Sequence, residues 1–219
     1  MNPKTQELKD KVTADFEAGK KAFQDAMAKA QSHIDVATAE VNKLRAELKT
    51  EAADAKAKTM ARVDELTKTL DAARKEQQDK IEAHLKELHG EMESIDAELK
   101  DAATAGKGAV EATAKAIREE YDSARKAMTA SFEAELAEYK ARIATAHDAA
   151  AQKKAAAKAS IQAKIAEAHA KHDAAEKKLH ALKQANAAAF GELQHGVRTA
   201  IAEVKSAVQH AHADITAAL

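Results

Sequence analysis

The sequence predicts an all-α protein in the form of a long antiparallel helical hairpin, a coiled-coil-like rod. An apolar residue returns at nearly every third or fourth position from Leu8 to Leu219, which is the spacing of one helix face. Of the 219 residues, 58 are Ala, 32% are charged and 3% are aromatic, a composition typical of long helices. Large apolar residues drop out in two segments, 50–59 and 144–160, where Ala is the apolar residue that remains, and the two segments are placed symmetrically about position 103.

The first predicted helix covers residues 3–103. Pro3 suits a first helical turn, and Asn2 can cap it. Gly19 and Gly90 lie inside this helix, where each costs about 1 kcal/mol relative to Ala. The large apolar residues of its row are Leu8, Val12, Phe16, Phe23, Met27, Ile34, Val41, Leu44, Leu48, Met60, Val63, Leu66, Leu70, Ile81, Leu85, Leu88, Met92, Ile95 and Leu99.

A turn is predicted at residues 104–108, which include the closely spaced pair Gly106 and Gly108. Glycine accepts the left-handed conformation that ends many helices. The second helix then covers residues 109–218 and folds back along the first, so that residues 1–219 form a single elongated domain. The alternative is one unbroken helical rod.

In this hairpin the two Ala segments lie against each other. Ala against Ala lets two helices approach to the short end of the usual range of about 8–10 Å, so the hairpin should have a waist. The apolar spacing averages slightly more than 3.6 residues, between a straight helix and an 11-residue repeat, which predicts near-straight or weakly right-handed helices.

Residues beyond about 205 would overrun the first helix in this register. Val208, Ile215 and Leu219 would then form an exposed apolar stripe. Such a stripe favours self-association, so we expect a homodimer or a larger homo-oligomer.

Residues 149–183 are the basic part of the chain, with eight Lys against three acidic residues. Lys153, Lys154 and Lys158 are the candidate contacts to an acidic partner, either an anionic lipid surface or nucleic acid. A solvated lysine face is the commoner meaning of such a stretch. Nucleic acid is not the expected partner, because no aromatic residue interleaves with these lysines for base stacking.

A weak metal candidate consists of His169, His172 and Glu176, whose spacings of three and four residues place them on one helical face. His172 falls on the apolar row, where a core histidine is commoner, and carboxylates are frequent in such helices. The sequence therefore predicts no metal site and no cofactor.

Catalytic motifs are also missing from the sequence. It has no Cys, no glycine-rich phosphate loop and no nucleophile elbow, and paired carboxylates such as Glu119 and Glu120 are interpreted as surface charges. We expect a protein that is not an enzyme and has no small-molecule substrate. The polar N-terminus lacks the apolar region of a signal peptide, and no stretch has the roughly 20 apolar residues of a membrane span, so a cytoplasmic location is expected.

Leu8, Gly19, Ala30, Val41, Ala52 and Val63 are spaced by eleven residues. This amphipathic repeat, rich in Ala, Glu and Lys, resembles the exchangeable apolipoproteins, although the prolines that punctuate their repeats are missing. The resemblance implies helices that open and lay their apolar faces on lipid. Dimerising helical hairpins of the BAR type are a second analogy.

Three functions follow as hypotheses. The first is a structural or scaffolding coiled-coil protein that acts by self-association or bridging. The second is an amphipathic helical protein that coats or shapes a lipid surface. The third is a weak nucleic-acid binder that uses the basic 149–183 stretch.

Overall fold

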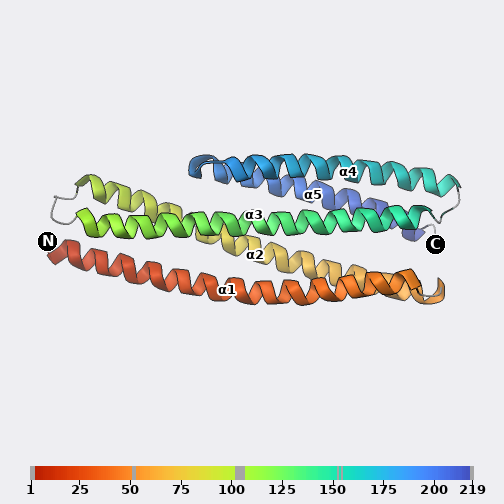
Figure 1. The fold of residues 1–219 in the computed structure, drawn as a ribbon, viewed down its shortest axis with the longest axis horizontal. Coiled ribbons are helices and arrows are strands. Elements are labelled where there is room, and N and C mark those ends of the chain that lie inside the picture. Colours follow the sequence, from red (N-terminus) through yellow and green to blue (C-terminus); the bar gives the residue numbers. More distant parts are fainter. Residues whose placement is uncertain (1–2, 51–52, 102–106, 152, 154, 218–219) are drawn as a thin grey trace. The chain divides into compact units, whose positions relative to one another are not determined.

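The computed structural model describes residues 3–50, 53–101, 107–151, 153 and 155–217. These residues form five α-helices: α1 (Pro3–Thr50), α2 (Ala53–Asp101), α3 (Lys107–Ala151), α4 (Ala155–Gln184) and α5 (Ala187–Ala217), shown in Figure 1. The prediction of an all-α fold is confirmed. Within the described ranges, no helix has a stretch long and apolar enough to cross a membrane.

The chain divides into two compact units where a single domain was predicted. Unit 1 is Met1–Met128 and unit 2 is Thr129–Leu219. The boundary falls inside α3, so unit 1 contains α1, α2 and the first part of α3. Unit 2 contains the rest of α3 together with α4 and α5.

The predicted helix over residues 3–103 is two helices in the structure. Helix α1 ends at Thr50, α2 begins at Ala53, and the two helices pack against each other (Figure 1). Their pairing is antiparallel, because a residue late in α1 contacts one early in α2, and a residue nearer the middle of α1 contacts one nearer the middle of α2. Arg62 Nη2 lies 2.6 Å from Glu40 Oε1, and Gln77 Nε2 donates to Gln31 Oε1 at 3.0 Å. Ile34, Ala37 and Leu70 form a buried cluster between these helices.

The predicted second helix, over residues 109–218, is interrupted twice. Helix α3 ends at Ala151 and α4 begins at Ala155, and α4 is followed by α5 after residues 185–186. The predicted turn at 104–108 falls largely on residues 102–106, which lie outside the described residues. Lys107 and Gly108 belong to α3.

The Ala segments explain where two of the interruptions occur, between α1 and α2 and between α3 and α4. Segment 50–59 contains the junction of α1 and α2, and segment 144–160 contains the junction of α3 and α4. A segment without large apolar side chains buries little area, so interrupting the helix there loses little packing energy. Their symmetry about position 103 reflects helices of similar length, with 48, 49 and 45 residues in α1, α2 and α3.

Unit 1 brings the first part of α3 against both α1 and α2. Lys20 of α1 pairs with Glu120 of α3 at 3.2 Å, and Arg118 of α3 pairs with Asp96 of α2 at 2.5 Å. The buried apolar side chains of this unit come from all three helices: Phe16, Ala30, Ile34, Ala37, Val41, Leu44, Leu70, Ile81, Leu85, Leu88, Ile95, Val110, Ala114, Ile117, Tyr121, Ala124 and Met128.

Unit 2 is built around the pairing of α4 with α5. Asn186 caps α5: its Oδ1 accepts a hydrogen bond from the Ala189 backbone N–H at 2.9 Å. Ser160 and Lys164, early in α4, both contact Asp214, late in α5, so these helices are antiparallel.

The apolar stripe predicted at the C-terminal end is wrong for the residues that the structure describes. Val208 is 6% exposed and Ile215 is 2% exposed, while Leu219 lies outside the described residues. Because α4 and α5 are separate antiparallel helices, the end of α5 packs against the start of α4 within unit 2. The finding concerns the stripe alone, and the homo-oligomer stays a prediction.

Candidate metal centre and buried histidines

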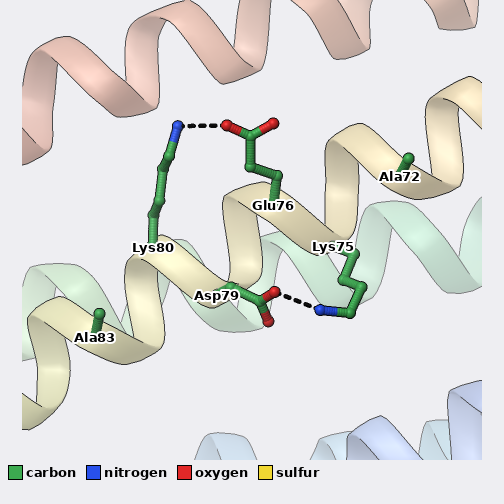
Figure 2. A pocket seen from close by; sticks show the side chains of 6 residues that line it. All are labelled: Ala72, Lys75, Glu76, Asp79, Lys80 and Ala83. Carbon is green, nitrogen blue, oxygen red and sulfur yellow. Dashed lines mark hydrogen bonds and ion pairs between the residues drawn. The ribbon is translucent and has the colours of Figure 1, made fainter.

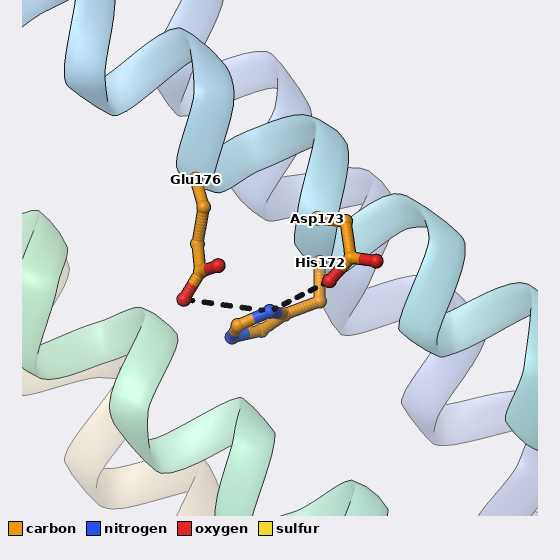
Figure 3. A group of neighbouring side chains, drawn as sticks. All are labelled: His172, Asp173 and Glu176. Carbon is orange, nitrogen blue, oxygen red and sulfur yellow. Dashed lines mark ion pairs between the residues drawn. The ribbon is translucent and has the colours of Figure 1, made fainter.

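Three ligand-type side chains meet on α4, at His172, Asp173 and Glu176 (Figure 3). His172 Nδ1 lies 3.8 Å from Glu176 Oε1 and 3.9 Å from Asp173 Oδ1. One ligand atom from each residue lies within 4.8 Å of the others. The imidazole is buried, whereas the two carboxylates reach it from the exposed side of the helix.

The orientation of His172 is set by a contact to another helix. His172 is 3% exposed, and its Nε2 lies 3.0 Å from the backbone oxygen of Leu136 in α3. A carbonyl oxygen can only accept, so Nε2 carries the hydrogen and donates it. In the neutral imidazole this leaves the lone pair on Nδ1, which is directed at the carboxylates.

The structure brings together two of the three residues that the spacing selected. His172 and Glu176 belong to the group, whereas His169 is exposed and does not. Asp173 takes its place, and sequence reasoning missed it. Adjacent helical residues diverge by about 100°, so spacing favours residues three or four apart. Asp173 reaches Nδ1 because its side chain bends across the helix surface.

A second buried histidine lies in unit 1. The His84 ring stacks on the Phe23 ring of α1, with centroids 4.1 Å apart and planes 19° from parallel. His84 Nε2 lies 3.6 Å from Glu120 Oε1, and its Nδ1 lies 3.8 Å from Glu87 Oε2. His84 Nε2 is buried without a hydrogen bond. The two nitrogens of His84 face different carboxylates, so His84 does not form a three-ligand metal site like the group at His172.

Glu120 corrects one interpretation of the sequence. The carboxylates of Glu119 and Glu120 were both interpreted as surface charges, but the side chain of Glu120 is 7% exposed and that of Glu119 is 69% exposed. Lys20 provides the charge that accompanies buried Glu120. The burial of Glu120 could have been inferred from the sequence, because Glu120 directly precedes Tyr121, a member of the apolar row.

At least three of the eight lysines in residues 149–183 form ion pairs within unit 2. Lys164 pairs with Asp214 at 2.7 Å, and Lys171 pairs with Glu203 at 3.5 Å. Lys183 pairs with Glu133 of α3. Each of these pairs joins α4 to a neighbouring helix. The hydrogen bond from Lys164 holds the pKa of Asp214 below its usual value, with further help from the Lys164 charge and Ser160.

The lysines predicted to bind a partner are not fully exposed where the structure describes them. Lys153 and Lys158 are half-buried, and Lys154 lies outside the described residues. The other predicted contacts, Val208 and Ile215, are buried in unit 2. The burial of Val208 and Ile215 removes them from an exposed partner surface, and partner binding by the lysines stays a prediction.

A shallow hollow lies along α2, with a volume of about 420 Å³ (Figure 2). All of its lining residues belong to α2: Ala72, Lys75, Glu76, Asp79, Lys80 and Ala83. Its charges are matched, because Lys75 pairs with Asp79 at 2.5 Å and Lys80 pairs with Glu76 at 2.7 Å. The hydrogen bond and charge of Lys80 lower the pKa of Glu76. The hollow has no net charge or convergent polar group to select a ligand.

Comparisons with protein-family models, with curated proteins and with solved structures gave no match for this chain. The fold and the sites described above define an all-α protein made of two helical units, each containing parts of three helices. Its function has to be argued from those units.

Proposed function

We propose that this chain is a non-catalytic structural protein, a helical scaffold that acts by self-association or by bridging partners. The observation that carries this proposal is that apolar and charged side chains hold the helices of each unit together. In each unit most of the large apolar residues are buried, and many charged residues join one helix to the next. Long helices held in this way suit a protein that spaces or connects others.

Helix length supports the same proposal. Helices α1 and α2 contain 48 and 49 residues, which correspond to about 70 Å each at 1.5 Å per residue. Because they pair antiparallel, unit 1 presents two opposite ends and a long charged flank. Such a shape provides attachment points far apart along one unit.

The character of the surface also favours protein partners over a polyanion. The formal net charge is −1, and the strongest excess of lysine, in residues 149–183, is partly neutralised by Asp214, Glu203 and Glu133. Nucleic-acid binding depends on an unneutralised basic surface. Mixed charges instead suit complementary patches on proteins.

A lipid-surface coat is the second candidate, and one observation favours it. Polar residues such as Arg74, Gln77 and His84 are buried in unit 1 beside its apolar row. A seam diluted by Ala and polar groups holds helices together less strongly than a fully apolar core. Since Val36 and Leu193 are the exposed large apolar residues among those described, lipid binding would require the helices to open.

Sedimentation equilibrium over a concentration series, combined with vesicle flotation and a mobility-shift assay, tests the scaffold proposal. We expect masses above the 23.4 kDa of one chain, no flotation with either anionic or neutral vesicles, and no salt-dependent shift of DNA or RNA. A 23.4 kDa species that floats with vesicles would replace the scaffold with the lipid coat. A monomer that neither floats nor shifts would exclude self-association and leave bridging as the mode.

A further inference from the structure

We propose that His172, Asp173 and Glu176 form a binding site for a divalent transition-metal ion of the zinc class. The site is a property of α4 and its contact to α3, and it is independent of the scaffold function. It supplies one imidazole nitrogen and two carboxylate oxygens, with water completing the coordination.

The distances suit a single ion after small movements. Ligand atoms of Zn²⁺ lie about 2.0–2.2 Å from the metal, so two of them in a tetrahedral arrangement lie about 3.4 Å apart. The Nδ1 of His172 is 3.8 Å from Glu176 Oε1 and 3.9 Å from Asp173 Oδ1. Both carboxylates must therefore approach by about 0.5 Å. Their side chains are 52% and 70% exposed, which leaves them room to move.

The imidazole is prepared for this role by the Leu136 carbonyl. Histidines that bind metals usually donate their second ring N–H to a carbonyl or carboxylate, which fixes the tautomer and the ring plane. His172 donates Nε2–H to Leu136 at 3.0 Å and directs Nδ1 toward both carboxylates. At 3.8 Å and beyond, Nδ1 makes no hydrogen bond to them. In the neutral ring, Nδ1 thus presents a lone pair to two carboxylate oxygens, which is the arrangement that a cation completes.

The nitrogen and oxygen donor atoms of the site indicate which class of metal ion it would bind. Ca²⁺ and Mg²⁺ prefer oxygen ligands alone, whereas imidazole with carboxylate suits Zn²⁺, Co²⁺ and related ions. Two carboxylates and a neutral imidazole carry a charge of −2, which balances a divalent ion.

Metal binding would also link α4 to α3. The Leu136 carbonyl lies on α3, and a metal on Nδ1 makes the Nε2–H a stronger donor. We therefore expect bound metal to raise the thermal unfolding temperature of the full chain. The rival explanation is an imidazolium held between two carboxylates with no metal, and the experiment must separate the two.

Isothermal titration of the metal-stripped full chain with Zn²⁺ at pH 7.5 separates them. We expect one site of 1:1 stoichiometry, weakened at least tenfold by Asp173→Asn and by Glu176→Gln. Both residues are exposed, so these variants should fold normally. His169→Ala, which removes an exposed histidine one turn away on the same helix, is the matched control and should bind as the unaltered chain does.

A second measurement, Co²⁺ absorption, tests the buried ligand His172. Co²⁺ should give visible absorption bands of a nitrogen–oxygen site in the unaltered chain and in His169→Ala, and these bands should be lost in His172→Gln. Circular dichroism of His172→Gln establishes that its helices are intact. The proposal is overturned if Zn²⁺ binds with equal affinity to the Asp173 and Glu176 variants, if binding is lost in His169→Ala, or if the unaltered chain shows neither heat nor Co²⁺ bands.

Discussion

Phe23 of α1 stacks on His84 of α2, with ring centroids 4.1 Å apart. Sixty-one residues separate the two positions, so this contact requires the chain to reverse between them. It also buries one face of His84, whose Nε2 lies near Glu120 of α3. One aromatic pair thus connects the α1–α2 reversal to the third helix of unit 1.

Removing this ring should weaken unit 1. We expect Phe23→Ala to lower the free energy of unfolding by about 2 kcal/mol, less than the 3–5 kcal/mol of a fully buried Phe, because Phe23 is only partly buried. Urea unfolding followed by circular dichroism measures the change. Val36→Ala, at a position 66% exposed on the same helix, is the control and should be nearly silent. Equal effects of the two variants would contradict the stacking.

The end of α5 gives a second prediction. Ile215 is 2% exposed, so Ile215→Ala should lower the free energy of unfolding by about 2–4 kcal/mol through a cavity in unit 2. Its effect on the mass measured by sedimentation should be small. If stability were unchanged and self-association were lost, Ile215 would belong to an exposed stripe after all.

The cap of α5 gives a third prediction. Asn186 Oδ1 accepts the Ala189 N–H, and loss of such a cap costs about 1 kcal/mol. Asn186→Ala should show this loss in thermal or urea unfolding, and Asn186→Asp should restore most of the stability. Were Asn186→Ala as stable as the unaltered chain, α4 and α5 would not need this cap.

The partly buried position of Glu91 predicts that the stability of the folded protein depends on pH. Burial raises its pKa above the ordinary value of 4.5, with smaller effects from the Glu87 and Asp15 carboxylates. The folded state therefore binds this proton more tightly than the unfolded chain. That contribution to stability is fully present below pH 4.5 and is lost as pH rises through the raised pKa.

At pH 7 the charged Glu91 opposes folding, so Glu91→Gln should stabilise the protein there. Because solvent screens this half-exposed group, we expect a gain of no more than about 1 kcal/mol. Urea unfolding at pH 7 and at pH 4 should show the gain only at the higher pH. Glu119→Gln, at an exposed position of α3, should show no such difference. The same gain at both values of pH would contradict the assignment.

The helical period and the composition were sufficient to predict an all-α fold, because both are properties of each helix by itself. The junctions between α1 and α2, between α3 and α4, and between α4 and α5 were not predicted. Alanine has the highest helix propensity, so segments 50–59 and 144–160 looked like continuous helix, and only packing shows that they contain junctions. Asn186 was a usable signal for the last junction, since it is a preferred cap directly before three Ala.

The candidate site was predicted in part for a similar reason. Helical spacing selected His172 and Glu176, which the structure brings together. It could not select Asp173, whose reach depends on its side-chain conformation. It also could not show the Leu136 carbonyl, which belongs to another helix and orients the ring.

The reversal between α1 and α2 is tested most directly by a distance between spin labels at positions 40 and 62. Glu40 and Arg62 lie in contact across the two helices at 2.6 Å, and both side chains are exposed enough to be replaced by labelled Cys. Packed helix axes lie about 8–10 Å apart, so pulsed electron paramagnetic resonance should give one short distance. The doubly labelled chain is diluted with unlabelled chain, so that the distance measured lies within one molecule. On a continuous helix the same 22 residues would separate the labelled backbones by about 33 Å. A distribution centred near that longer distance would contradict the fold described here.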